Sequence, residues 1–144
     1  MSRAPLKGRE AYRAWREVPT RWSDNDLYGH VNNTVYYAWF DTAVNAWLIG
    51  AGLLDLSAGD PIGLVVETGC RYARPLAYPQ VVEVGLAVER FGTSSVRYRL
   101  GVFPKGETQA AAEGFFVHVY VGRDQRRPVP LPQEWRTALA ELQT

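Results

Sequence analysis

The sequence predicts an α+β fold in which a five-stranded antiparallel sheet wraps around one long central helix. Three observations lead to this prediction. One strand-like segment precedes a single helical segment, and four segments with a hydrophobic period of two follow it. The turns between these four segments are short, which is typical of an antiparallel meander. The helical segment is apolar on most sides, and a helix of that kind must be enclosed by the rest of the fold.

The first element is a short strand, expected at Val18–Trp22. Pro19 lies inside it and lacks an N–H donor, so the strand is expected at a sheet edge or at a bulge. Residues 23–33 are expected to form a polar loop, because Asp, Asn, Ser and Gly are concentrated there. The first ten residues carry no pattern and no apolar stretch of the kind found in secretory signals.

The second element is a helix, expected over residues 33–49. Asn32 or Asn33 can cap its first turn, and Gly50 and Gly52 end it. Most of its faces are apolar, but a few polar residues fall near one stripe at helical spacing. This stripe faces either water, at the open side of the sheet, or a subunit or ligand. It consists of Thr34, Asp41, Thr42 and Asn45.

The remaining strands are expected at residues 62–72, 80–91, 94–103 and 109–122. In the second of them Val and Leu alternate with Glu, Gly and Ala, so one face is buried and the other is partly exposed. A short tail helix is expected at about residues 131–143. The chain is therefore predicted to be a single domain of residues 1–144 with its core at about residues 12–122.

The composition excludes several classes of protein. The chain has 16 basic and 15 acidic residues, a balance that predicts neither a nucleic-acid partner nor a membrane partner. One cysteine excludes an internal disulfide, and two histidines far apart in the sequence argue against a metal site. The longest apolar stretch, residues 35–54, is interrupted by polar residues and is no membrane span. These features predict a cytoplasmic protein.

Residues 24–33, just before the helix, are where chemistry is expected. They contain Asp24, Asp26, His30 and three asparagines. The first amides of a helix lack acceptors and carry partial positive charge, so they can stabilise a carbonyl oxygen that gains negative charge. A nearby carboxylate could attack that carbonyl or deprotonate a water. The alternative is that both aspartates form turns and caps, and that His30 bonds to nearby backbone.

Two other reactive side chains have simpler explanations. Cys70 lies in a strand pattern with no histidine nearby in the sequence, which predicts a packed and inert thiol. His118, in the last predicted strand, is expected to pack in the core or to face solvent. Neither residue is expected to take part in catalysis.

Residues 21–33 read Arg-Trp-Ser-Asp-Asn-Asp-Leu-Tyr-Gly-His-Val-Asn-Asn and are followed by tyrosines at positions 36 and 37. This segment closely resembles the signature Arg-x-x-Asp-x-Asp-x-x-Gly-His-Val-Asn-Asn of the hot-dog-fold acyl-CoA thioesterases. The nearest group is the 4-hydroxybenzoyl-CoA thioesterase-like family. Residues 70–76 and 88–96 also resemble strand junctions of that family. The resemblance covers about residues 12–122 and agrees with the order of elements predicted above.

The resemblance implies hydrolysis of an acyl-CoA thioester without a cofactor or metal. It assigns the catalytic carboxylate to Asp26, as nucleophile or general base, and the amide that polarises the carbonyl to Asn33. His30 and the turn at Gly29 match positions that orient the carbonyl or thiol end of the substrate. Plant-type acyl-carrier thioesterases have an asparagine two residues after the aspartate. Here that position is Tyr28, and this difference favours the benzoyl-type arrangement. We expect Tyr28 itself to contact the substrate.

Several details are left open. Some relatives bind the CoA phosphates through basic residues in the turn between the third and fourth strands, but residues 92–95 contain none. Arg74, Arg90 and Arg97 are candidates instead, although each can equally be a solvated charge on a strand. Glu67, in an apolar run, either lines the acyl pocket near the catalytic carboxylate or lies on the outer face of its strand.

The resemblance also implies edge-to-edge pairing of sheets, so a homodimer or homotetramer is expected. Two other functions fit the same fold. A non-catalytic module that binds acyl thioesters would need no carboxylate at position 26. An enoyl-thioester hydratase or dehydratase would need an acid/base pair and a proline-containing turn, and the 24–33 loop has no proline.

Overall fold

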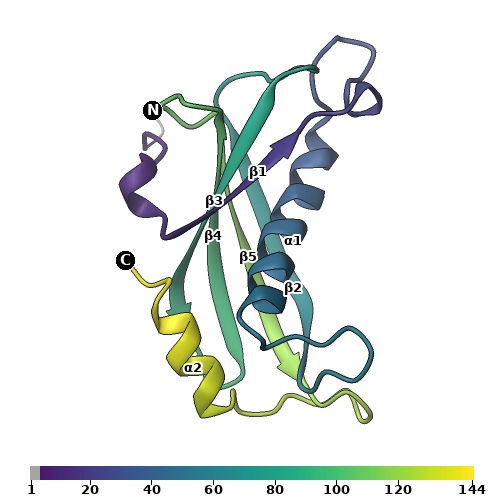
Figure 1. The fold of residues 1–144 in the computed structure, drawn as a ribbon, viewed down its shortest axis with the longest axis vertical. Coiled ribbons are helices and arrows are strands. Elements are labelled where there is room, and N and C mark those ends of the chain that lie inside the picture. The colour runs from purple at the N-terminus through teal and green to yellow at the C-terminus, as the bar shows by residue number, and fades with distance from the viewer. Residues whose placement is uncertain (1–3) are drawn as a thin grey trace.

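A computed structural model describes residues 4–144 of the chain and contains one sheet and two α-helices (Figure 1). Two 3-10 turns, Arg9–Ala11 and Trp22–Asp24, flank the first strand. The strands and α-helices are β1 (Ala14–Pro19), α1 (Asn33–Gly50), β2 (Ile62–Tyr72), β3 (Val81–Phe91), β4 (Ser95–Pro104), β5 (Ala112–Val121) and α2 (Gln133–Ala140).

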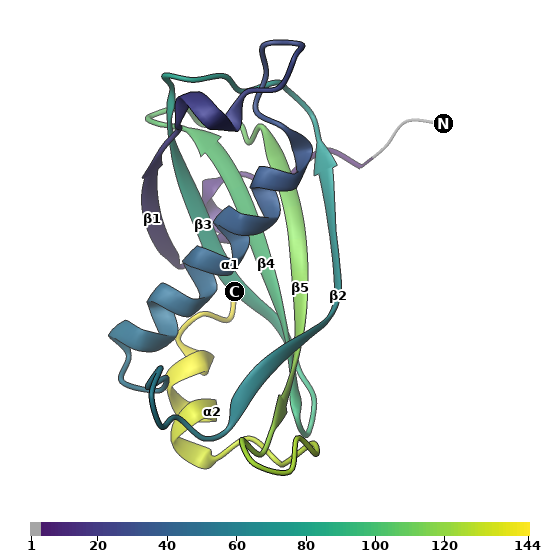
Figure 2. The same ribbon diagram turned by 90° about the vertical axis from the view of Figure 1, so that its right-hand side faces the viewer.

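The five strands form one antiparallel sheet in the order β1-β3-β4-β5-β2. The long helix α1 lies across one face of this sheet, and α2 lies beyond the end of α1 (Figures 1 and 2). This is the hot-dog arrangement that the sequence predicts, and the predicted fold class is confirmed. Because β1 and β2 are the edge strands, each has one side without a strand neighbour within residues 4–144.

The core lies between α1 and the inner face of the sheet. The predicted period of two holds on the inner faces of β3 and β4: in β4 the alternate residues Val96, Tyr98, Leu100 and Val102 are all buried. They face Phe40, Val44 and Leu48 of α1 within one apolar cluster. The outer face of the sheet is partly covered by the N-terminal segment, where Tyr12 packs against Phe103.

The first strand lies earlier in the chain than Val18–Trp22, and that prediction of its position was wrong. β1 pairs with β3 from Ala14 to Pro19, and Trp22 belongs to the following 3-10 turn. The strand ends at Pro19, because a proline cannot continue the ladder of N–H donors. Its expected place at a sheet edge is correct.

Asn32 is the N-cap of α1. Its Oδ1 accepts hydrogen bonds from the Thr34 amide at 3.0 Å and from the Thr34 hydroxyl at 2.7 Å. At the other end the chain turns at Gly52, whose φ of +77° is a conformation that glycine adopts without strain. No helix within residues 4–144 is long and apolar enough to cross a membrane.

The sheet covers only one side of α1. Its buried residues lie on that side, whereas Thr34, Asp41 and Thr42 on the predicted polar stripe are exposed. Asn45 is half-buried and donates hydrogen bonds back to Asp41. The stripe therefore faces outward in the single chain, which leaves it accessible to water or to another molecule.

Candidate active site

Asp26 opens a tight turn whose hydrogen bonds fix its position. Its Oδ1 accepts a hydrogen bond from the Tyr28 amide at 2.9 Å, and its carbonyl oxygen accepts one from Gly29 at 3.0 Å. Its own amide donates to the carbonyl oxygen of His30 at 2.9 Å. Gly29 has a φ of +80°, in the left-handed region where a side chain would add strain. The turn thus holds the Asp26 side chain by one oxygen.

The loop is also tied to its surroundings just before α1 begins. The Val31 amide donates to the carbonyl oxygen of Leu76 at 2.7 Å, and the Asn32 amide donates to that of Asp24 at 2.8 Å. These bonds connect the loop to the segment between β2 and β3 and to its own start. The position of Asp26 relative to the first turn of α1 is therefore fixed by backbone contacts.

Asp24 has a different environment from Asp26. Only 1% of its surface is exposed, and its oxygens accept hydrogen bonds from the Arg21 backbone amide, Nε and Nη2 at 2.7–3.0 Å. The two aspartates lie two residues apart, but Asp24 ends the 3-10 turn and is bonded back to Arg21, whereas Asp26 is bonded forward to Tyr28. Asp24 has the turn-forming role that was the structural alternative for this cluster. Asp26 is half-buried and borders a pocket.

The pocket at Asp26 has a volume of about 440 Å³, within the usual range for a small-molecule site. Three parts of the chain form it: the Asp26 turn, the first turn of α1, and the end of β2 with the residues after it. The residues that line it are Asp26, Tyr28, His30, Val31, Asn33, Tyr36, Tyr72, Ala73, Arg74 and Pro75. Most of the residues predicted for the site are thus brought together in one place.

The pocket includes the positive end of the α1 dipole. Within residues 4–144 the Asn33 amide makes no hydrogen bond, whereas the Thr34 amide is held by the Asn32 cap. Such a free amide at a helix N-terminus is suited to an oxygen that carries negative charge. Asn33 and Asp26 both line this pocket, so a residue with a free amide and a residue with a carboxylate border the same space.

Comparison with known proteins agrees with this arrangement. Residues 20–139 match the thioesterase-like superfamily. The chain belongs to this superfamily. No curated protein matches the chain. The fold described above is therefore that of a member of the thioesterase-like superfamily.

Solved structures of similar proteins cover nearly the whole chain. The PA5185 protein from Pseudomonas aeruginosa strain PAO1 is 55% identical, with a TM-score of 0.92 over 95% of this chain and 96% of that one. The PA2801 protein from Pseudomonas aeruginosa is 31% identical, with a TM-score of 0.82 over 88% and 98%. Slr0204 from Synechocystis, a 1,4-dihydroxy-2-naphthoyl-CoA thioesterase, is 23% identical and shares the fold, with a TM-score of 0.79 over 89% and 96%.

Tyr72 is a residue of this thioesterase-family pocket that the sequence analysis did not single out. Its hydroxyl donates a hydrogen bond to the carbonyl oxygen of Asn33 at 3.0 Å, and its ring packs edge-on against Tyr36. It lies 39 residues after Asn33, and only the course of β2 brings the two together. A tyrosine at the end of a strand is too common for its position alone to indicate such a role.

The charged residues expected at the substrate lie in three different places. Arg74 borders the pocket, but its guanidinium donates to Glu107 at 3.0 Å and to the carbonyl oxygen of Gln109 at 2.6 Å. Glu67 is exposed and pairs with Val117 of β5, outside the pocket of its own chain. Arg90 is exposed at the end of β3, also outside it.

Cys70 and His118 are both packed. Burial raises the pKa of the Cys70 thiol to about 11, as expected for an inert cysteine. His118 is 3% exposed and packs against Tyr98 and Phe116, one of the two alternatives for this residue. Within residues 4–144 no group of three His, Cys, Asp or Glu side chains is placed to hold a metal ion.

Proposed function

We propose that this chain hydrolyses an acyl-CoA thioester to the free acid and CoA. The observation that carries the proposal is that Asp26 and Asn33, whose amide makes no hydrogen bond within residues 4–144, line the same pocket. A thioester carbonyl placed between them would have a group that polarises its oxygen and a group that acts on its carbon. The membership of the thioesterase-like superfamily supports the same reaction.

In this proposal the first turn of α1 stabilises the transition state. As the carbonyl carbon becomes tetrahedral, its oxygen gains negative charge and accepts a hydrogen bond from the Asn33 amide. The helix dipole adds partial positive charge at the same point. These interactions strengthen only as charge develops, so they lower the barrier more than they strengthen substrate binding.

Asp26 acts in one of two ways. As a general base it removes a proton from water, whose oxygen bonds to the carbonyl carbon while the bond to sulfur breaks. As a nucleophile its oxygen forms an anhydride with the acyl group, which water then hydrolyses. In both cases the CoA thiolate leaves and takes up a proton. His30, exposed at the pocket beside Tyr28 and Gly29, would orient the thioester end.

We also propose that the active unit is at least a homodimer, formed along β2. This edge strand is eleven residues long, and the apolar Leu64, Val65 and Val66 in it are 38%, 47% and 60% exposed. Unpaired backbone groups beside exposed apolar side chains suit antiparallel pairing with a second copy.

Such a dimer would also border the pocket. β2 ends at Tyr72, which lies in the pocket wall. Antiparallel pairing about the middle of β2 would bring the partner's strand start beside this end and would place both copies of Glu67 near the two-fold axis. Of the basic residues expected at the CoA phosphates, Arg74 borders the pocket and is the proposed contact, whereas Arg90 on β3 lies outside it.

The experiment is a thiol-release assay with a panel of aromatic and aliphatic acyl-CoAs. Asp26→Asn should reduce turnover on the best substrate by roughly 10²- to 10⁴-fold, because the carboxylate charge is lost while the side chain keeps its size. Asp24→Asn is the matched control, since it should lower the free energy of unfolding by about 2 kcal/mol and leave the turnover of folded enzyme nearly unchanged. Folded Asp26→Asn protein with wild-type turnover would refute the assignment.

A further inference from the structure

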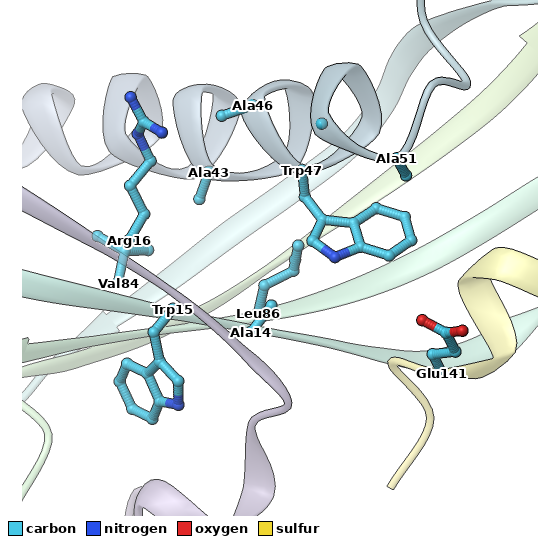
Figure 3. Close-up of a pocket in the computed structure, with 11 residues that line it drawn as sticks. Ala14, Trp15, Arg16, Ala43, Ala46, Trp47, Ala51, Val84, Leu86 and Glu141 are labelled. Atoms are coloured by element: carbon cyan, nitrogen blue, oxygen red, sulfur yellow. The ribbon is translucent and has the colours of Figure 1, made fainter.

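A second cavity lies between α1 and the β1 edge of the sheet. It has a volume of about 390 Å³ and is lined by the C-terminal half of α1, by β1 and β3, and by the end of the chain (Figure 3). None of its lining residues borders the Asp26 pocket. β1 and β2 are opposite edges of the sheet, so a dimer along β2 would leave this cavity open. We call it the β1 groove.

The β1 groove exists because small residues face one another across it. Ala43, Ala46 and Gly50 of α1 lie three and four residues apart, which places them on one side of the helix. Ala14 of β1 is the residue opposite, and the buried Val84 and Leu86 of β3 border the groove below (Figure 3). A groove of this size, bordered by small side chains, can receive a ligand.

Arg16 supplies a positive charge to the β1 groove. It pairs with Val84 in the register of β1 and β3, so the two side chains lie on the same, inner face of the sheet. Figure 3 shows the Arg16 side chain rising from β1 alongside α1, whereas its neighbour Trp15 points to the other side. Within residues 4–144 the Arg16 guanidinium makes no hydrogen bond or ion pair.

The other parts of the β1 groove have different chemistry. The Trp47 indole projects from α1 into the space between helix and sheet, and Glu141 lies at the far end from Arg16 (Figure 3). An anionic group is therefore attracted at the Arg16 end and repelled at the Glu141 end. The middle, made of alanine, valine, leucine and indole surface, favours an apolar body.

We propose that the β1 groove binds a hydrophobic carboxylic acid, with its carboxylate at Arg16 and its apolar part between Trp47 and Leu86. A guanidinium forms paired hydrogen bonds with a carboxylate, and an unpaired one on the core side of a sheet is available for such a ligand. The site is separate from the proposed catalytic pocket. An acid bound there would contact the half of α1 that follows the catalytic first turn.

Alanine methyl groups provide a direct test, because they line both sites. Decanoate would be titrated into the full chain carrying ¹³C-labelled alanine methyls, each assigned with a single substitution. We expect saturable shifts at Ala14, Ala43 and Ala46, which line the β1 groove. Ala73 lines the Asp26 pocket and reports binding there. Shifts confined to Ala73, or no saturable shift at all, would overturn the proposal.

Two variants and one second ligand identify the contacts. Arg16→Gln, at an exposed side chain, should raise the Kd measured by the β1 groove methyls about tenfold, because a charge-assisted hydrogen bond is lost. Ala46→Leu should weaken binding by filling the groove. Decylamine should bind more weakly than decanoate. A Kd unchanged by Arg16→Gln would overturn the proposal and leave Arg16 as a charge that merely protects the sheet edge.

Discussion

The Tyr72 hydroxyl donates a hydrogen bond of 3.0 Å to the carbonyl oxygen of Asn33, the first residue of α1. This bond connects the end of an edge strand to the helix terminus that forms one side of the pocket. Burial raises the pKa of the Tyr72 hydroxyl, which keeps it protonated as a donor at all ordinary pH values. The free Asn33 amide belongs to the same residue as the acceptor, so we expect this bond to help position it.

Tyr72→Phe tests this positioning role. Removing one hydrogen bond should lower kcat about five- to tenfold, while KM changes less, because the bond orients the amide and does not touch the substrate. Steady-state kinetics with the best acyl-CoA would measure both constants. Tyr78→Phe, at an exposed tyrosine outside the pocket, is the matched control and should leave both unchanged. An equal loss in the two variants would argue against a specific role for Tyr72.

Gly29→Ala tests the turn that holds Asp26. At a φ of +80° an alanine is strained, although no atom lies within 4 Å of the position of its Cβ. We expect the free energy of unfolding to fall by about 1–2 kcal/mol, and turnover to fall as the turn relaxes. Gly50→Ala has equal space but no positive φ and should be neutral or slightly stabilising. Urea unfolding followed by circular dichroism would measure the free energy of unfolding of both variants. An equal loss of unfolding free energy in Gly29→Ala and Gly50→Ala would contradict the role of strain.

Val66→Lys tests the proposed pairing along β2. Val66 lies at the bulge in this edge strand, and a lysine there would place like charges together in a symmetric pair. Light scattering should show the wild-type chain as a dimer or larger and the variant as a monomer of 16.2 kDa. Thr137→Lys, at an exposed position of α2, should leave the assembly intact. A wild-type monomer at micromolar concentration would exclude the dimer.

The sequence predicted most of the fold because its patterns are local. The alternation in β3 and β4 and the capping residue of α1 depend only on neighbours in the chain, and each appears in the structure. The start of β1 could not be predicted in the same way. Its residues Ala14 and Arg16 face the β1 groove and carry no apolar alternation, so only pairing with β3 identifies them as a strand.

The site was predictable only in part for a related reason. Asp26, His30 and Asn33 are neighbours in sequence, and the helix that follows them fixes where they lie. Tyr72 and Arg74 come to them from a distant strand, and their contacts depend on the register between β2 and β5. The different hydrogen-bond partners of Asp24 and Asp26 depend on a 3-10 turn that ends at Asp24 and that no spacing rule predicts.

His118 gives the last prediction, which concerns stability and pH. Its ring is enclosed on the inner face of the sheet, and its Nε2 has no hydrogen-bond partner within residues 4–144. Burial lowers the pKa of His118 to about 4, from an ordinary value of 6.5. Between these two pH values the unfolded chain binds a proton at this residue and the folded chain does not. His118 therefore lowers the free energy of unfolding as the pH falls from about 6.5 to 4, by up to about 3 kcal/mol.

His118→Phe should remove this dependence, because a phenyl ring fits among Tyr98, Phe116 and Tyr120 and cannot bind a proton. The test is urea unfolding of both proteins at several pH values between 7 and 4. Carboxylates titrate equally in the two, so the difference in unfolding free energy isolates His118. The free energy of unfolding of the variant should rise steadily relative to that of the wild-type protein as the pH falls below about 6.5. A difference that stays constant over the whole range would mean that His118 is protonated as easily in the folded chain as in the unfolded one.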